Sequence, residues 1–331
     1  MELLKKLTSA NAVSGSENSV HALITKEVSP YVDEIYTDSL GNLIAHKKAN
    51  GKKLMLSAHV DEIGLMANYI DENGFVRFSP VGGVDIYASL YQRVVFENGT
   101  VGVVSFENKS DVKKDLKIST MYIDIGASDK ETAMKMVQPG DTAAFFGEFR
   151  KCGANIISKA LDNRSGVYIL IEALKKISLS PFDLYFVFTS QEEIGLKGAR
   201  TAAYSIEPDA AIAVDVTSTG DTPGCETMDV SIGKGAAIKI MDKSLIAHKS
   251  VREGMQRCAR KNCIPFQHEI LSYGGTDAGA MQTSKGGCLT GAVSLPVRYV
   301  HTPCEMADEN DINACISLVA ELCKVDHFFE R

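Results

Sequence analysis

The sequence has no tryptophan, no long apolar run and no excess of basic residues. Carbohydrate-binding clefts usually use broad aromatic rings, so the absence of tryptophan disfavours a sugar substrate. No segment approaches the ~18 uninterrupted apolar residues of a membrane helix. The 35 lysines and arginines face 42 acidic residues, and the net charge of −7 is spread without the basic stripe that neutralises phosphates. We therefore expect neither a membrane nor a nucleic-acid partner.

The eight cysteines are scattered along the chain, and no two of them form a C-x-x-C pair. This pattern is typical of reduced thiols and disfavours a disulfide framework or a thiolate zinc site. The first residues, Met1 to Lys6, contain no apolar segment behind a basic one, which a secretory signal would have. These features predict a cytoplasmic protein.

The 331 residues, 45% of them apolar, suffice for about two average domains. From residue 163 onward, short apolar runs alternate with helical patterns, which indicates a mostly parallel sheet covered by helices. Between residues 67 and 155 the pattern changes to short strands and tight turns, such as Asn98-Gly99. We predict an α/β domain made of residues 1–66 and 156–331, with a small β-rich domain, residues 67–155, inserted into it.

Ligands in an open α/β sheet bind beyond the carboxyl ends of the strands, so polar residues that follow apolar runs are candidate site residues. Strands are predicted at 53–57, 184–189 and 210–214, and within 288–300, and a last helix at 308–329. The candidates at or near the ends of these runs are His59, Asp61, Asp162, Glu192, Glu193, Asp215 and His301.

Each candidate taken alone has a simple structural explanation. Asp162 could cap the helix predicted at 164–177, Asp215 could close a turn, and His301 could hydrogen-bond within a loop. Together the candidates would place two imidazoles and at least three carboxylates at one sheet edge. Unpaired carboxylates repel one another unless cations lie between them. A pair of divalent metal ions is the simplest arrangement that satisfies this set.

Six segments, in this order, resemble the M42 metallo-aminopeptidases of the MH clan. They are LSAHVDEIGL, KALDNRSG, TSQEEIGLKGA, AVDVT with DTPG, GGTDAGA and VSLPVRYVHTPCE. The similarity covers nearly the whole chain, including Asp38–Asn42 and the IDIGASDKE segment of the predicted inserted domain. Two residues depart from the family pattern, Asn163 in place of Asp and Ala236 in place of Pro, and neither is a predicted ligand.

The resemblance implies two divalent metal ions per subunit, zinc or cobalt, with manganese as a third option. It assigns His59, Asp162 and Glu193 to one ion. It assigns Asp162, Asp215 and His301 to the other ion, so that Asp162 bridges the two.

The same resemblance implies the chemistry. Glu192 is the expected general base, which takes a proton from the attacking water and gives it to the leaving amine. Asp61, two residues from His59, is expected to orient that imidazole. The implied function is the removal of N-terminal residues from peptides. In similar proteins the inserted domain mediates dimers that assemble into a tetrahedral dodecamer, so a homo-oligomer is expected. The alternative is that the inserted domain is only a lid.

Two other functions stay open. Paired carboxylates can cleave glycosidic bonds, and proteins of this resemblance have been labelled endoglucanases, but the missing tryptophan and the two histidines argue against a glycoside hydrolase. A non-catalytic metal-binding subunit of an assembly is the second alternative, and the presence of Glu192 argues against it. The cluster of Lys234, Lys239, Lys243 and Arg252 suggests an attraction to acidic substrate side chains, with a solvated surface as the alternative.

Overall fold

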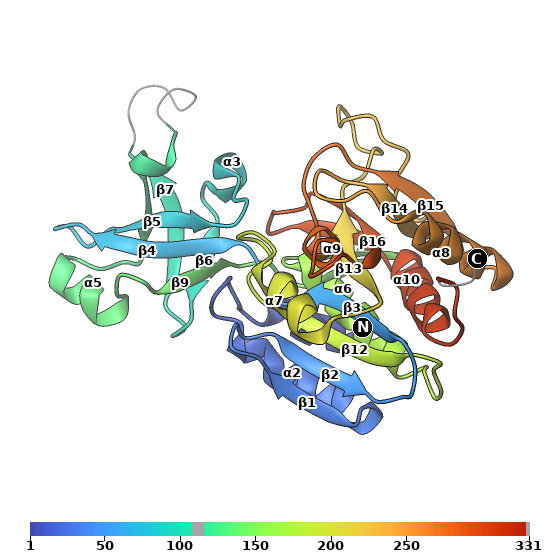
Figure 1. Cartoon of the computed structure of the whole chain (residues 1–331). Coiled ribbons are helices and arrows are strands. Elements are labelled where there is room, and N and C mark those ends of the chain that lie inside the picture. Colours follow the sequence, from blue (N-terminus) through green and yellow to red (C-terminus); the bar gives the residue numbers. More distant parts are fainter. Residues whose placement is uncertain (108–115, 329–331) are drawn as a thin grey trace.

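A computed structural model describes residues 1–107 and 116–328. In these residues, an 11-stranded sheet with helices forms the larger part of the molecule, and a closed barrel of six strands forms the smaller part (Figure 1). The barrel lies in the chain between two strands of the large sheet, β3 (Lys53–His59) and β10 (Arg150–Cys152). The expected α/β fold with an inserted β-rich part is therefore confirmed.

The large sheet has one main path of strands and a two-strand extension. The path is β1 (Glu34–Thr37), β2 (Leu43–Lys47), β12 (Asp183–Thr189), β3, β13 (Ala210–Thr217), β16 (Leu289–Arg298), β17 (Glu305–Asp308), β11 (Asn155–Ser158) and β10. The extension from β16 consists of β14 (Ala236–Met241) and β15 (Phe266–Ile270).

The centre of this sheet, made of β12, β3, β13 and β16, is parallel. Every residue of β13 is buried, as expected for a strand that is covered on both faces. The prediction of a mostly parallel sheet is correct for this centre and wrong for the flanks, where β1, β2, β10, β11 and β17 all pair antiparallel. Short connections, such as the one between β10 and β11, join antiparallel neighbours, because parallel neighbours need a long crossover.

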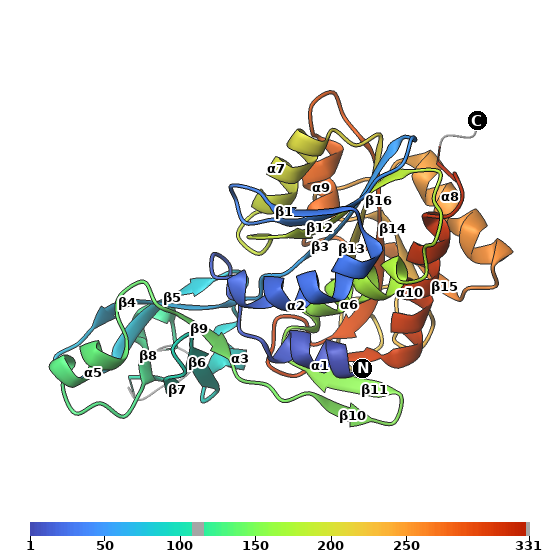
Figure 2. The ribbon, with the colours of Figure 1, turned by 90° about the horizontal axis from the view of Figure 1, so that it is seen from below.

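Helices cover both faces of the large sheet (Figure 2). One face packs against α1 (Glu2–Ser9), α2 (Asn18–Val28), which continues into the 3₁₀ helix η1 (Ser29–Tyr31), α6 (Leu161–Leu174), α8 (Lys249–Lys261) and α10 (Glu309–Leu322). The other face packs against α7 (Lys197–Ile206) and α9 (Asp277–Gln282). Among residues 1–107 and 116–328, no helix combines the length and the apolar character needed to cross a bilayer.

The last helix is shorter than predicted, because α10 ends at Leu322 and not at residue 329, which lies outside the described residues. Beyond Cys323 the chain turns, and the ring of Phe328 packs against that of Phe182 with 6.0 Å between the centroids. Apolar residues after Leu322 thus reach the core from a turn, which their spacing alone does not distinguish from a helix.

The barrel has its own apolar core. Its strands, in order around the barrel, are β4 (Gly64–Ile70), β5 (Val76–Val81), β8 (Met121–Asp124), β7 (Val101–Phe106), β6 (Arg93–Phe96) and β9 (Thr142–Phe145), accompanied by α3 (Ile86–Ser89), η2 (Ile118–Thr120) and α5 (Lys130–Met136). The barrel strands thus begin at Gly64 and end at Phe145, while β10 and β11 belong to the large sheet. The division into two domains at residues 67 and 155 stays a prediction.

Candidate metal centre

The parallel strands bring their carboxyl ends to one edge of the sheet. His59 is the last residue of β3 and pairs with Thr189, the last residue of β12. Asp215 lies near the end of β13, which is the neighbour of β3 on its other side. Asp162 lies in the first turn of α6, and His301 follows β16. Residues that are far apart in the sequence therefore meet at one place.

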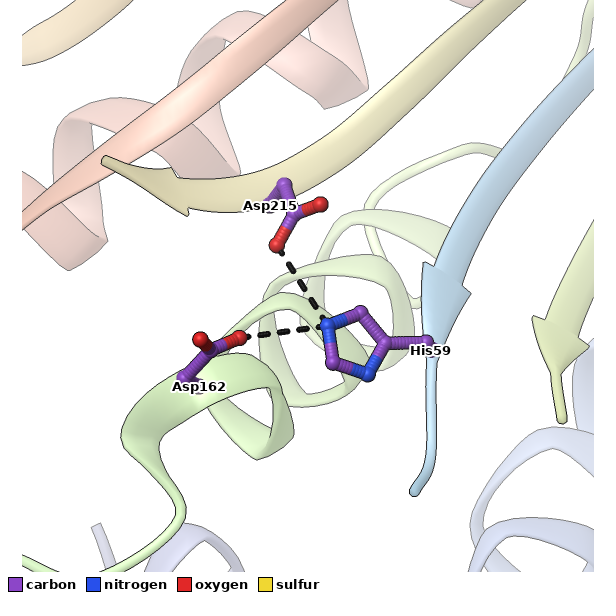
Figure 3. A group of neighbouring side chains, drawn as sticks. All are labelled: His59, Asp162 and Asp215. Atoms are coloured by element: carbon purple, nitrogen blue, oxygen red, sulfur yellow. Dashed lines mark hydrogen bonds and ion pairs between the residues drawn. The ribbon is translucent and has the colours of Figure 1, made fainter. Parts of the chain in front are cut away.

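His59, Asp162 and Asp215 form the first of two candidate metal-binding triplets (Figure 3). Nε2 of His59 lies 3.1 Å from Oδ1 of Asp162 and 3.6 Å from Oδ1 of Asp215. All three side chains are buried, and their ligand atoms lie within 4.8 Å of one another. This spacing is compatible with one cation among the three.

Asp162, Glu193 and His301 form the second triplet. Nε2 of His301 lies 3.3 Å from Oδ2 of Asp162 and 3.3 Å from Oε2 of Glu193. Asp162 turns Oδ1 toward the first triplet and Oδ2 toward the second. One carboxylate is therefore placed to serve both.

The structure groups these residues differently from the expected assignment, which paired Glu193 with His59 and Asp215 with His301. Asp215 lies beside His59 because β13 pairs directly with β3. Glu193 follows β12 in the loop before α7 and reaches the imidazole of His301 instead. The shared position of Asp162 is the same in both groupings.

Both imidazoles present Nε2 to the carboxylates, because Nδ1 of each ring is engaged elsewhere. Nδ1 of His59 lies 3.2 Å from the backbone oxygen of Asp61 and 3.4 Å from its Oδ1. Nδ1 of His301 donates to the backbone carbonyl of Gly83 over 3.0 Å. A hydrogen on Nδ1 leaves the lone pair of Nε2 available for a cation.

Asp61 is fully buried and organises the loop that follows β12. Its carboxylate accepts hydrogen bonds from the hydroxyl of Ser14 at 2.6 Å and from the backbone N–H groups of Glu192 and Glu193 at 3.0 and 3.1 Å. Asp61 thus contacts His59 and also holds the backbone of both glutamates, whereas the sequence predicted only its contact with the imidazole.

Glu192 lies next to the first triplet, with Oε2 at 4.0 Å from Nε2 of His59. Burial, opposed by the attraction of His59, raises the pKa of Glu192 well above its usual range, and repulsion from Asp215 adds to this. A carboxylate with a raised pKa accepts a proton from water more readily near neutral pH. Its environment therefore suits a general base.

Glu305, on β17, was not predicted as a site residue. Its buried carboxylate accepts hydrogen bonds from the backbone N–H groups of Asp162 and His301, each at 2.9 Å. Glu305 thus ties together the backbones of two residues of the second triplet. An acidic residue in a short strand carries little signal by itself, because a solvated surface strand has the same sequence.

Gly83, in the loop between β5 and α3, was also missed. A Cβ atom added there would lie 2.7 Å from Nδ1 and 2.9 Å from Cε1 of His301. The backbone of the inserted segment therefore approaches the imidazole more closely than any side chain at this position would allow.

The ligand set fits divalent cations. Each triplet offers one imidazole nitrogen and two carboxylate oxygens, and three protein ligands leave positions open for water or substrate, as in catalytic metal sites. Burial raises the pKa of both Asp215 and Glu193, which reflects the free-energy cost of collecting ionised carboxylates here. Cations among the carboxylates would offset that cost.

A cavity of about 620 Å³ opens onto both triplets. Its wall also includes Glu192, Lys239, Leu271, Tyr273 and Thr276. A volume of this size is typical of sites for small ligands. The central strands of this α/β fold end at two triplets of metal-ligand type, beside a buried acid and an open cavity. These features are typical of the class of metal-dependent hydrolases.

Comparison with known proteins identifies the family. Residues 41–318 match the M42 glutamyl aminopeptidase family. A protein of Acetivibrio thermocellus, provisionally named an aminopeptidase, is 52% identical over 320 residues, which are 97% of each chain. Lysyl aminopeptidase of Pyrococcus furiosus is 34% identical over 97% of this chain and 96% of its own.

Solved structures agree with this match. An aminopeptidase from the archaeon Desulfurococcus kamchatkensis has a TM-score of 0.94 and 39% identity, over 98% of this chain and 94% of its own. The TET1 peptidase of Pyrococcus horikoshii, which can assemble into a tetrahedron or a large octahedral shell, has a TM-score of 0.87 and 34% identity, over 98% of each chain. The chain therefore belongs to the M42 glutamyl aminopeptidase family, and it is a metal-dependent aminopeptidase, an exopeptidase that hydrolyses peptides.

Proposed function

We propose that the chain is a dinuclear enzyme, with one divalent ion held by His59, Asp162 and Asp215 and a second held by Asp162, Glu193 and His301. The observation that carries this proposal is the position of Asp162, whose two carboxylate oxygens face different imidazoles at 3.1 and 3.3 Å. A single ion could use only one of these two imidazoles, and it would leave the carboxylate of either Asp215 or Glu193 outside its ligand set. Zinc, cobalt and manganese all accept this donor set.

The chain's own residues supply the proton transfers. Ions bound at the two triplets would polarise the scissile carbonyl group and lower the pKa of water. Glu192 would accept the proton of the attacking water and return it to the leaving amine. Asp61 holds the backbone N–H of Glu192, which fixes the start of that side chain relative to His59.

The substrates would be peptides with a free amino terminus. The first residue would occupy the cavity beside Asp215 and Glu192, whose carboxylates would attract the terminal amine. The remainder of the peptide would leave through the open side of the cavity. A sugar substrate has no amine for these carboxylates to bind, which favours the peptidase over the glycoside hydrolase.

The test is an assay of metal-depleted protein that is reloaded with zinc, cobalt or manganese. We expect hydrolysis of aminoacyl p-nitroanilides, no hydrolysis of cello-oligosaccharides, and two ions per chain by elemental analysis. N-acetylated versions of the same anilides are the matched control and should not be cleaved. Binding of a single ion at full activity would contradict the dinuclear proposal.

We further propose that the barrel, residues 64–145, mediates assembly into a homo-oligomer, from a dimer up to a tetrahedral dodecamer. The similarity to a TET1 peptidase that assembles into a tetrahedron supports this proposal. Exposed apolar residues such as Tyr69 and Tyr91 give the barrel segment surfaces for contacts with another subunit. Light scattering on the eluted, metal-loaded protein should give a mass above that of one chain, and a monomer would refute the proposal.

A further inference from the structure

Lys239 is a fully buried lysine in the wall of the cavity. It lies on β14, which pairs with the middle of β16, and β16 pairs on its other side with β13, the strand that carries Asp215. Lys234 and Lys243, its neighbours in the sequence cluster, are exposed. Of these three lysines, only Lys239 lines the cavity.

Two buried carboxylates hold the ammonium group of Lys239. Glu269, its partner in the parallel register of β14 and β15, accepts a hydrogen bond through Oε1, and Oδ2 of Asp242 lies 3.5 Å away. Although burial opposes it, the attraction of Glu269 and Asp242 raises the pKa of Lys239, so the amine is charged. The other oxygen of Glu269 is buried and has no hydrogen-bond partner among the described residues. One cation against two carboxylates gives the group a formal charge of −1.

From this arrangement we infer that the cavity selects substrates whose first side chain is uncharged and rejects both acidic and basic ones. This inference rests on the proposed aminopeptidase function and specifies its substrate class. It replaces the hypothesis of an acidic preference, because the lysine that reaches the cavity is already paired with carboxylates.

Charges of both signs are disfavoured for separate reasons. An acidic side chain would gain little from the ammonium of Lys239, because the two negative charges of Glu269 and Asp242 outweigh its single positive charge. A basic side chain would lie beside the positive charge of Lys239 and could not reach its carboxylate partners, because neither Glu269 nor Asp242 belongs to the cavity wall. Rejection by unpaired or like charges is an effective source of specificity. Leu271 and Val216 in the same wall offer an uncharged side chain apolar contacts.

The experiment measures kcat/KM of the metal-loaded protein on leucine, glutamate and lysine p-nitroanilides. We expect the leucine substrate to exceed each of the other two by at least about tenfold, a factor of ten being the usual effect of one unfavourable pocket contact. A glutamate or lysine substrate turned over as fast as the leucine substrate would overturn the inference while leaving the proposed function intact. No hydrolysis of any of the three by protein that holds its metal ions would overturn both.

Two variants identify the residues responsible. Glu269→Gln removes one negative partner of Lys239 and should raise the glutamate-to-leucine ratio of kcat/KM by about tenfold, whereas Lys239→Met should raise the lysine-to-leucine ratio. Lys234→Met, which removes an exposed charge from the same segment, is the matched control and should leave both ratios unchanged. Unchanged ratios in the folded Glu269→Gln protein would overturn the role of the cluster. Product inhibition of the wild-type protein by leucine, but not by glutamate or lysine, is an independent readout.

Discussion

Replacement of Glu305 by glutamine tests whether this carboxylate keeps the second triplet in place. The change preserves the shape of the side chain, but it exchanges one acceptor oxygen for an NH₂ group. In the native protein both oxygens of Glu305 accept backbone hydrogen bonds, Oε2 from Asp162 and Oε1 from His301. Glutamine can accept only one of them, and its NH₂ group would face the other N–H donor.

The expected effect follows from one buried backbone N–H that loses its acceptor, which costs about 1–3 kcal/mol. Because about 1.4 kcal/mol corresponds to a factor of ten, Glu305→Gln should weaken metal binding by roughly 10–100-fold. The weaker ion should be the one held by Asp162, Glu193 and His301, since His301 contributes a ligand to that triplet alone. The ion held by His59, Asp162 and Asp215 should be weakened less, because Glu305 accepts a backbone hydrogen bond from only one of its ligands, Asp162.

The assay is calorimetric titration of metal-depleted protein with zinc, which resolves the two binding events. Glu309→Gln is the matched control, because Glu309 is near in sequence but forms its ion pair with Lys151, which belongs to neither triplet. Circular dichroism of the metal-free proteins verifies that both variants are folded. Two ions bound with wild-type affinity by folded Glu305→Gln protein would refute the role assigned to this carboxylate.

Four further outcomes are expected. Chelation should abolish peptide hydrolysis and lower the unfolding temperature, because the buried carboxylates lose their cations, and added zinc or cobalt should restore both. Glu192→Gln should reduce kcat by at least about 10²-fold while elemental analysis still finds wild-type metal content, and surviving activity would refute its role as the base. Gly83→Ala should displace His301 and weaken metal binding, whereas Gly286→Ala, where an added Cβ meets nothing within 4 Å, should not. Burial raises the pKa of Asp311 to about 6, so its folded form holds a proton that the unfolded chain loses near pH 4. The free energy of unfolding should therefore decrease as the pH rises from about 4 to 6, by up to about 1.4 kcal/mol per pH unit. A calorimetric pH series of Asp311→Asn should lack this component.

The positions of the candidate ligands could be predicted because each follows a sequence pattern that is local. His59 ends an apolar run of strand length, and Asp215 interrupts the end of another. The pair Glu192 and Glu193 follows another strand of this kind after two intervening residues. The rule that ligands gather at the carboxyl ends of parallel strands then brings these residues together without any knowledge of loops.

The grouping of the ligands and their supports could not be predicted, because both depend on which strands are neighbours. The order β12, β3, β13 puts Asp215 beside His59, and no local pattern states that order. Glu305 matters through hydrogen bonds to the backbone of residues that are distant in the sequence. The flanks of the sheet were mispredicted for a related reason, since short strands such as β10 and β17 are too brief to show a period.

The hydrogen bond from His301 to the carbonyl of Gly83 makes the inserted barrel segment part of the chemistry and not merely an appendage. Excision of residues 64–145, or their exchange for an unrelated module, would remove the acceptor of Nδ1 even if every ligand were retained. A smaller enzyme designed from this fold would therefore have to keep the backbone at Gly83, or provide another acceptor for Nδ1 of His301.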